Sequence, residues 1–205
     1  MNKIYEKKFA IYKDYLNPYL LRHIPRNSLV LDVGCSNGIQ GKYLKKEKGC
    51  LVYGVDISQQ AIKEAKKNLD KAVVMDVEKD SLPFKEKFDA IIFSDILEHL
   101  AYPEEVLRKL KKHLKKDGLI AAAIPNVANL KIRLHLLLGK WDYQELGILD
   151  KTHLRFFTKG TARQLFENCG LEIIEEDWSP EFAFIPCQIY PPLFARHIII
   201  VAKKR

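Results

Sequence analysis

Residues 30–38 read VLDVGCSNG, a short apolar strand that runs directly into a turn with glycine at positions 34 and 38. Glycine lets a backbone approach a ligand closely and adopt angles that a side chain would forbid. A helix is expected to follow over residues 38–48. A strand, a glycine turn and a helix in this order predict the first unit of an α/β fold, with a ligand site at the turn.

The chain around this turn alternates between apolar strands and amphipathic helices. Strands are expected near residues 28–33, 51–56, 72–75, 88–93, 119–124, 171–177 and 196–203, and helices over 3–23, 38–48, 58–69, 103–114 and 160–168. Strands without polar interruption are buried on both faces, which predicts a mostly parallel, doubly wound sheet with helices on both faces. We expect one domain over 1–205, with an N-terminal helical segment at 1–27, which Pro18 could break, and an insertion at 126–157.

Composition excludes several classes of protein. The 205 residues are 47% hydrophobic and 29% charged, a globular mixture, and their apolar runs are far shorter than the ~18 residues of a membrane-spanning helix. The charged amino terminus has no secretory signal, so we expect a cytoplasmic protein, and the four scattered cysteines form no zinc or disulfide pattern. The net charge of +8 comes largely from lysines on expected helix faces, so nucleic acid ranks below a small molecule as partner.

Carboxylates follow three of the expected strands. Asp32, Asp56 and Asp76 stand at or just beyond strand ends, where ligands of doubly wound sheets bind. Asp56 is placed to accept hydrogen bonds from both ribose hydroxyls, and Asp76 from an adenine amino group. A dinucleotide fingerprint needs glycine where Ser36 and Ile39 stand, so the spacing argues against NAD and against a nicotinamide-dependent oxidoreductase, and it favours a nucleoside without pyrophosphate.

These residues resemble the class I S-adenosylmethionine-dependent methyltransferases. Residues 30–38 look like that family's glycine-rich motif, 55–58 (VDIS) like its ribose-binding strand end, Asp76 with 82–84 (LPF) like its adenine motif, and 88–100 (FDAIIFSDILEHL) like its fourth strand. One departure is Ser36, where the family has a middle glycine. The resemblance implies a Rossmann-like seven-stranded sheet with an antiparallel last strand, and S-adenosylmethionine as methyl donor, leaving as S-adenosylhomocysteine. It implies these cofactor-binding residues: Asp32, Gly34, Cys35, Ser36, Gly38, Asp56, Ile57, Asp76, Val77 and Ser94.

Two histidines are candidates for a catalytic role. Methyl transfer is an in-line displacement, and an oxygen nucleophile benefits from a base such as His99 or His153. His99 lies in Asp95-x-x-Glu98-His99, so Glu98 and His99 have three readings: a base, a divalent-cation site, or the start of a helix that orders the cofactor loop. The remaining histidines are expected at surface or packing positions: His23, His113, His135 and His197.

The insertion at 126–157 is the expected acceptor-site cap, because it interrupts the α/β alternation beside the cofactor. Trp141 and Tyr143 could stack on a sugar or aromatic ring, Asp150 could accept from hydroxyls, and Arg155 could pair with a phosphate or carboxylate. The string 149–158 (LDKTHLRFFT) resembles a methyltransferase subgroup associated with bacterial glycosyltransferases and surface polysaccharides, which implies a sugar, nucleotide-sugar or glycan acceptor. A quinone, a lipid or RNA is the alternative acceptor, and a non-catalytic S-adenosylmethionine-binding domain is the alternative of another class. The oligomeric state does not follow from the sequence.

Overall fold

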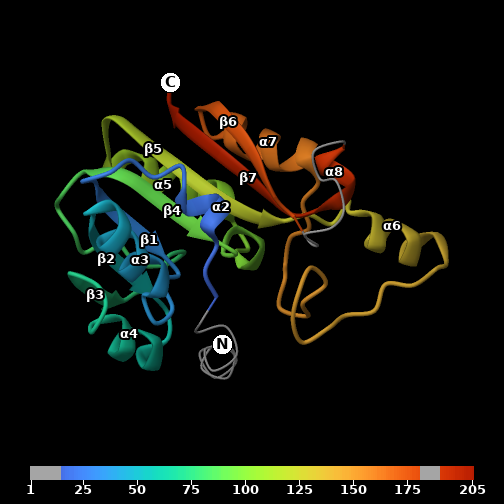
Figure 1. Cartoon of the computed structure of the whole chain (residues 1–205), viewed down its shortest axis with the longest axis horizontal. Coiled ribbons are helices and arrows are strands. Elements are labelled where there is room, and N and C mark those ends of the chain that lie inside the picture. The colour runs from blue at the N-terminus through green and yellow to red at the C-terminus, as the bar shows by residue number, and fades with distance from the viewer. Residues whose placement is uncertain (1–14, 181–189) are drawn as a thin grey trace.

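The computed structural model describes residues 15–180 and 190–205, and these residues form one seven-stranded sheet (Figure 1). The strands are β1 (Leu29–Val33), β2 (Leu51–Asp56), β3 (Lys71–Val74), β4 (Phe88–Ser94), β5 (Leu114–Pro125), β6 (Leu171–Pro180) and β7 (Ala195–Lys204). Their order across the sheet is β3-β2-β1-β4-β5-β7-β6, and β7 runs antiparallel to both of its neighbours. The predicted fold class, including the antiparallel last strand, is confirmed.

Helices cover both faces of the sheet, as the apolar strands predict. The helical elements are α2 (Pro18–Leu21), α3 (Ile39–Lys48), α4 (Gln59–Ala65), η1 (Leu97–His99), α5 (Pro103–Leu110), η2 (Lys111–His113), α6 (Leu130–Leu137), α7 (Lys159–Asn168) and α8 (Pro191–Phe194). One core layer joins α5 and α7 to the sheet, and the other joins α2, α3 and α4 to the opposite face. Successive residues of β1 alternate between them, since Val30 lies in one layer and Leu31 in the other.

The expected helix over residues 3–23 is confirmed only at 18–21 within the described residues; its first part, up to residue 14, lies outside them. Residues 15–17 are not helical, and α2 begins at Pro18. The Asn17 side chain caps this helix by accepting a hydrogen bond from the Leu20 backbone N–H at 3.2 Å. Pro18 therefore starts a helix instead of breaking one, because the first helical position needs no N–H donor.

The insertion at 126–157 projects from the carboxyl edge of the sheet (Figure 1). It contains α6 and a long irregular segment, and it has a small core of its own made by Ile132, Ile148 and Leu149. Trp141 and Phe156 pack against this core with their rings edge to face and their centroids 5.2 Å apart. The segment thus keeps a shape of its own beside the sheet. No helix of the described residues is both long and apolar enough to cross a bilayer.

Candidate functional site

The glycine turn adopts the strained backbone that its sequence predicts. Gly34 and Gly38 have φ angles of 73° and 78°, in the left-handed region. A Cβ on Gly34 would stand 2.0 Å from Cδ1 of Ile96, so only glycine fits there without a shift of the neighbouring segment. Ser36 also has a positive φ, of 49°, at the position where the family pattern has glycine. The turn keeps its shape with serine at this position, but the backbone of Ser36 is strained.

Two carboxylates meet at this turn. Asp56 ends β2, and its two oxygens accept backbone N–H groups from Ser36 and Ser58, each at 2.9 Å. Asp32 is 1% exposed, and its Oδ2 has no hydrogen-bond partner among the described residues. Burial, with a smaller contribution from the Asp56 charge, raises the pKa of Asp32 to about 7. This buried, unpaired oxygen suits a cationic amino group as ligand.

A cavity opens beside these carboxylates. Its walls come from the turn, from the segment after β4, from the cap and from the start of β7. Eight of the predicted site residues line it: Asp32, Gly34, Cys35, Ser36, Asp56, Ser94, His99 and His153. The structure therefore brings the cofactor turn and both candidate histidines to one place, although together they span more than one hundred positions of the sequence.

The other predicted residues lie outside the lining of this cavity. Gly38 and Ile57 adjoin lining residues in the sequence, whereas Asp76 and Val77 follow β3 in a separate turn. Asp76 accepts hydrogen bonds from the Glu78 backbone at 3.1 Å and from the Lys79 ammonium at 2.7 Å. Burial acts to raise the pKa of Asp76, but these bonds prevail and lower it. Asp76 is thus an ionised acceptor that Lys79 already engages.

The four predicted acceptor residues lie in the cap, away from the cavity wall. Trp141 and Tyr143 stand beside Phe156, and Tyr143 is largely exposed. Asp150 is fully buried, and its Oδ1 accepts both the backbone N–H and the hydroxyl of Thr152 at 2.8 Å. Arg155 is exposed and donates to the Ala101 carbonyl. In this conformation these side chains shape the cap from outside the cavity.

Glu98, His99 and His153 form a compact cluster at the cap side of the cavity. One ligating atom from each lies within 4.8 Å of the others, and the two rings pack edge to face at 4.7 Å. His99 Nδ1 lies 3.2 Å from the Thr152 carbonyl and His153 Nδ1 lies 3.0 Å from the Ile148 carbonyl. A carbonyl only accepts, and the Thr152 hydroxyl, which is also 3.2 Å from His99 Nδ1, donates its hydrogen to Asp150. Each Nδ1 therefore carries the hydrogen when the ring is neutral, and the basic lone pair lies on Nε2.

Glu98 also holds the cap to the sheet. Its carbonyl accepts the backbone N–H groups of Leu154 and Arg155 at 2.8 and 3.0 Å, and its side chain is buried with Oε1 3.9 Å from His153 Nε2. The residue is the middle one of the short helix η1, which begins one position earlier than the structural reading of this motif expects. Glu98 can therefore hold the cap in place and belong to the cluster at the cavity at the same time.

The assignment of His197 to a packing role is incomplete. His197 is 3% exposed, lines the cavity and places Nε2 2.8 Å from Oδ1 of Asp95. Burial acts to raise the pKa of Asp95, but the nearby His197 prevails and lowers it. Asp95 itself has a φ of 55°, which turns it away from the helical path of η1. A carboxylate and an imidazole thus form one wall of the site.

These features agree with the comparison of the sequence to known families. A family model described as "Methyltransferase domain" matches residues 5–176, which is most of the chain. The chain belongs to this methyltransferase family. With its glycine turn and strand-end carboxylates, it is an S-adenosylmethionine-dependent methyltransferase of class I.

Several proteins resemble this methyltransferase. The ubiquinone biosynthesis O-methyltransferase of Neisseria meningitidis serogroup C is 24% identical over 174 residues, which cover 78% of this chain and 72% of the relative. A methyltransferase structure from Methanosarcina mazei aligns with a TM-score of 0.68 at 19% identity, covering 92% and 98% of the two chains. The magnesium protoporphyrin IX methyltransferase of Synechocystis, solved with S-adenosylhomocysteine, aligns at 0.63 and 16% identity over 100% and 83%. The two structures share the fold of this chain.

The cavity of this methyltransferase fits S-adenosylmethionine. The unpaired Oδ2 of buried Asp32 is a partner for an ammonium group, and Asp56 is fixed at a strand end by two backbone bonds. Ile96 fills the position that a Cβ on Gly34 would take, so glycine lets the segment after β4 close onto the turn at the cavity wall. The glycine turn itself, residues 34–38, carries no Lys or Arg for a pyrophosphate, in keeping with a nucleoside ligand.

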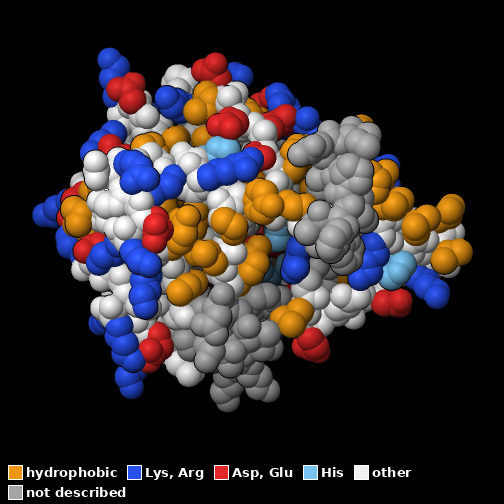
Figure 2. Space-filling model, in the orientation of Figure 1, with side chains coloured by type: hydrophobic (Ala, Val, Ile, Leu, Met, Phe, Trp, Pro, Cys, Tyr) orange, Lys and Arg blue, Asp and Glu red, His pale blue; other side chains and the backbone are white. Residues whose placement is uncertain are grey.

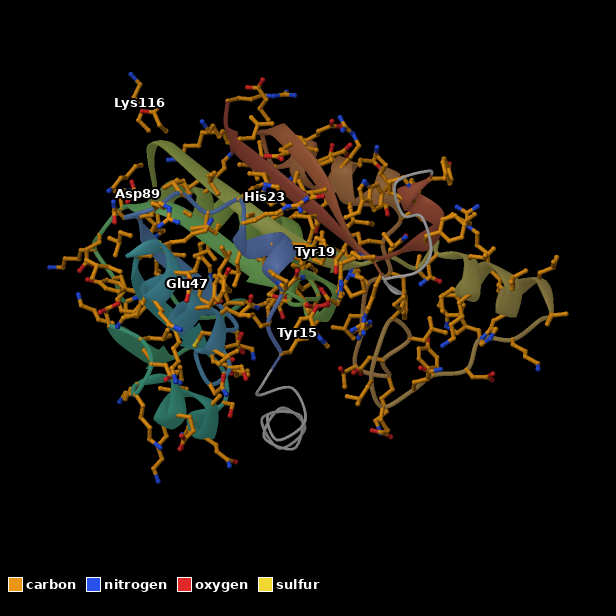
Figure 3. The ribbon with its side chains drawn as sticks, viewed as in Figure 1. Tyr15, Tyr19, His23, Glu47, Asp89 and Lys116 are labelled. Atoms are coloured by element: carbon orange, nitrogen blue, oxygen red, sulfur yellow. The ribbon has the colours of Figure 1, made fainter. Side chains whose placement is uncertain are left out.

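Residues that sequence reasoning missed come from segments far from the motifs. Tyr15, labelled in Figure 3, lines the cavity from just before α2, and Arg196 and His197 line it from the start of β7. Burial and the Asp95 charge raise the pKa of Tyr15, so its hydroxyl stays protonated. One signal was available for β7: an antiparallel strand begins at the edge where the parallel strands end, and His197 pairs with Pro125 at that edge.

The Asp95–His197 pair gives a testable prediction about stability. We expect His197→Leu to lower the free energy of unfolding by about 1–3 kcal/mol at pH 7, because a largely buried carboxylate loses its partner. His197→Gln, which keeps a side-chain N–H donor, should lose less. The contribution of a carboxylate with a lowered pKa exists above its unfolded pKa and disappears as pH falls through the folded value. Urea unfolding at pH 7 and pH 2 should therefore show a smaller deficit at pH 2; equal deficits would contradict an ionic contribution.

Proposed function

We propose that this methyltransferase transfers a methyl group to a hydroxyl oxygen of a small acceptor. The observation that carries this proposal is the pair of imidazoles at the cavity, His99 and His153, whose Nδ1 atoms are both held by carbonyls. S-adenosylmethionine supplies an already activated methyl group, so the protein has to align the reactants and remove a proton. An oxygen nucleophile gains from proton removal near neutral pH, and a neutral imidazole suits that task.

The proposal gives each part of the cavity a task. The glycine turn, formed by Gly34, Cys35, Ser36 and Gly38, lies along the cofactor. Ile57 and Ser94 lie next to this turn. Asp56 binds the ribose hydroxyls and Asp32 binds the amino group, in line with its unpaired buried oxygen. Asp76 and Val77 bind the adenine. For this, the Asp76 carboxylate gives up its hydrogen bond from Lys79 and accepts one from the amino group of the adenine.

The acceptor we propose first is a sugar, nucleotide sugar or glycan intermediate. This rests on the resemblance of residues 149–158 to the subgroup associated with surface polysaccharides, and on the mixed polar and aromatic character of the cap. Trp141, Tyr143 and Arg155 would contact the part of such an acceptor that extends out of the cavity onto the cap, while Asp150 keeps the cap in shape through Thr152. A quinone precursor is the second candidate, because relatives over 78% of the chain are named ubiquinone biosynthesis O-methyltransferases. Both acceptors present a hydroxyl.

The proposed role of the two histidines is tested by their alanine variants. We expect His99→Ala and His153→Ala each to lower kcat by about 10²–10⁴, the usual contribution of a general base, with little change in S-adenosylhomocysteine affinity. Calorimetric titration measures the affinity, and turnover is measured on hydroxyl acceptors of both classes. His113→Ala, in the exposed η2 helix, is the matched control and should be unchanged. Unchanged turnover in both cavity variants would remove the base assignment.

The same cluster suits a divalent cation as a second candidate role. One ring nitrogen from each imidazole and one carboxylate oxygen lie within 4.8 Å of one another, and such groups are common ligands for a divalent ion. The contacts of both Nδ1 atoms with backbone carbonyls orient the two rings. The turnover assay distinguishes the two roles when it is repeated after chelation. Loss that Mg²⁺ or Mn²⁺ restores assigns the cluster to a cation, and undiminished turnover assigns it to proton transfer.

A further inference from the structure

Helix α6 carries apolar side chains on its outer face as well as on the face that packs into the cap. Ile132 is 7% exposed and packs into the small core of the cap, so it marks the inward face. At about 100° per residue, Leu130, Leu134, Leu137 and Leu138 fall on the opposite side of the helix. Leu137 and Leu138 are 81% and 70% exposed, and the other two are also exposed. We call these four residues the leucine stripe.

The leucine stripe is part of a projecting surface. Figure 1 shows α6 at one extremity of the molecule, away from the sheet, and Figure 2 shows hydrophobic side chains gathered at this end. Leu136 lies on the same side of the helix as Ile132 but is also exposed, so it adds to the apolar surface of this projecting end. Isolated exposed leucines are ordinary, but a continuous row that the protein's own fold leaves uncovered indicates a surface with a partner.

Positive charge surrounds the leucine stripe. Lys131 and Arg133 fall on either side of it at the same helical spacing, and Lys140 follows within one turn. The sequence has no Asp or Glu between residues 126 and 141. Within the described residues none of these three cations has a carboxylate partner; the Arg133 side chain donates to the Ala128 carbonyl. Their charge therefore faces outward without internal neutralisation.

We propose that α6 docks on an anionic lipid surface, with the leucine stripe in the acyl boundary and the flanking cations at the headgroups. A helix that lies in such an interface needs one apolar face bordered by Lys or Arg, which is the arrangement here. The stripe is short and outward-facing on a projecting helix, so it can enter a bilayer surface without moving the rest of the cap. A charged lipid layer satisfies both the apolar row and the unpaired cations.

The proposal has a consequence for the acceptor, which rests on the proposed function. Ile132 contacts the same small core as Ile148, and Ile148 lines the cavity. A membrane that holds α6 would therefore lie beside the cap that borders the site. An acceptor with a hydrophobic tail could reach the cavity from that membrane, which favours the quinone or a lipid-linked sugar over a free sugar.

Co-sedimentation with vesicles tests the proposal on the full chain. We expect binding to vesicles of phosphatidylglycerol and phosphatidylcholine, weaker binding to phosphatidylcholine alone, and a loss of affinity at high salt. The triple variant Leu134→Gln, Leu137→Gln and Leu138→Gln keeps good helix formers and should lower the partition coefficient at least tenfold. Lys131→Gln with Lys140→Gln should lower it by about fivefold for each charge.

Two control variants distinguish binding through this surface from nonspecific binding to vesicles. Leu51→Gln alters a leucine at the start of β2 that is 56% exposed, and Lys112→Gln with Lys116→Gln removes charge at the opposite end of the molecule, where Figure 3 labels Lys116. Neither should change the partition coefficient by more than twofold. The proposal is overturned if the wild-type chain does not bind anionic vesicles, or if the triple variant binds them with the same partition coefficient as the wild type.

A second copy of the chain is the competing occupant of the stripe. Sedimentation velocity without lipid decides between them: a dimer that the triple variant abolishes, together with no vesicle binding, overturns lipid docking. S-adenosylhomocysteine affinity and near-UV circular dichroism should be unchanged in the triple variant, which shows that it is folded. Because this readout does not depend on turnover, loss of vesicle binding and failure of the proposed methyl transfer remain distinguishable.

Discussion

Asp56→Ala is expected to weaken S-adenosylhomocysteine binding by at least 100-fold in a calorimetric titration. The carboxylate is placed for the two ribose hydroxyls, and hydrogen bonds to a charged group contribute about 1.5–3 kcal/mol each. The same change removes the acceptor for the Ser36 and Ser58 backbone N–H groups, so the glycine turn also loses its anchor. Wild-type protein should show no saturable heat with NAD, since the glycine spacing does not fit a pyrophosphate.

Asp89→Ala is the matched control for this experiment. Asp89 also accepts a backbone N–H, from Leu29 at 2.8 Å, but at the other end of β1 (Figure 3). Its loss should lower stability modestly and leave ligand affinity within about twofold of wild type. Equal loss of binding in both variants would show a general effect on the sheet. Full affinity in Asp56→Ala would contradict the assignment of Asp56 to the ribose.

Asp32→Asn is expected to make the free protein more stable at pH 8 than the wild type, by up to about 4 kcal/mol. The pKa of buried Asp32 is raised from 3.8 to about 7, so the folded state holds a proton that the unfolded state releases between these values. Stability therefore falls as pH rises from 4 through 7, and the penalty is complete above the folded pKa. Asparagine has no charge to bury, so urea unfolding of the variant should lack this decline.

The same carboxylate should make ligand binding depend on pH. An ammonium group beside Asp32 favours its ionised form, so binding releases a proton near neutral pH and becomes tighter as pH rises from 6 to 8. Calorimetry in buffers of different ionisation enthalpy measures that proton. Asp32→Asn should bind more weakly and show no proton release. A variant that binds as tightly as wild type at pH 8 would contradict contact between Asp32 and the amino group.

The local elements of the fold were predictable because short-range signals determine them. The bounds of β2 agree with the expected strand, Ser58 caps α4 through the Ala61 backbone N–H, and Gly49 ends α3 in the left-handed region. Helix α4 ends four residues earlier than expected, since Asn68 instead bonds the Asn37 carbonyl and Leu69 packs against the glycine turn. Tertiary contacts thus shortened a helix that its local pattern would have continued.

The acceptor side of the site was less predictable, because it is assembled by contacts between distant segments. His197 stands in an apolar strand sequence, and its spacing gives no sign that Asp95 lies 2.8 Å away. The cap shows the opposite case. Asp150 stands in a sequence motif that predicts contact with the acceptor, but in the structure its carboxylate bonds Thr152 in a buried turn. Motif residues at strand ends were found, whereas residues placed by the packing of β7 and the cap were not.

The position of β7 between β5 and β6 affects how the protein is made. Residues 171–180 leave the ribosome before residues 195–204, yet among the described strands β6 pairs only with β7. The nascent chain therefore holds β5 with an unpaired edge until the later strand inserts, and contacts of such long sequence separation form slowly. The turn around Asp32 and Asp56 can be completed by then, but the wall carrying His197 cannot. During synthesis the nucleoside half of the site precedes the acceptor half, and a bound nucleoside could stabilise a chain whose sheet still has an open, aggregation-prone edge.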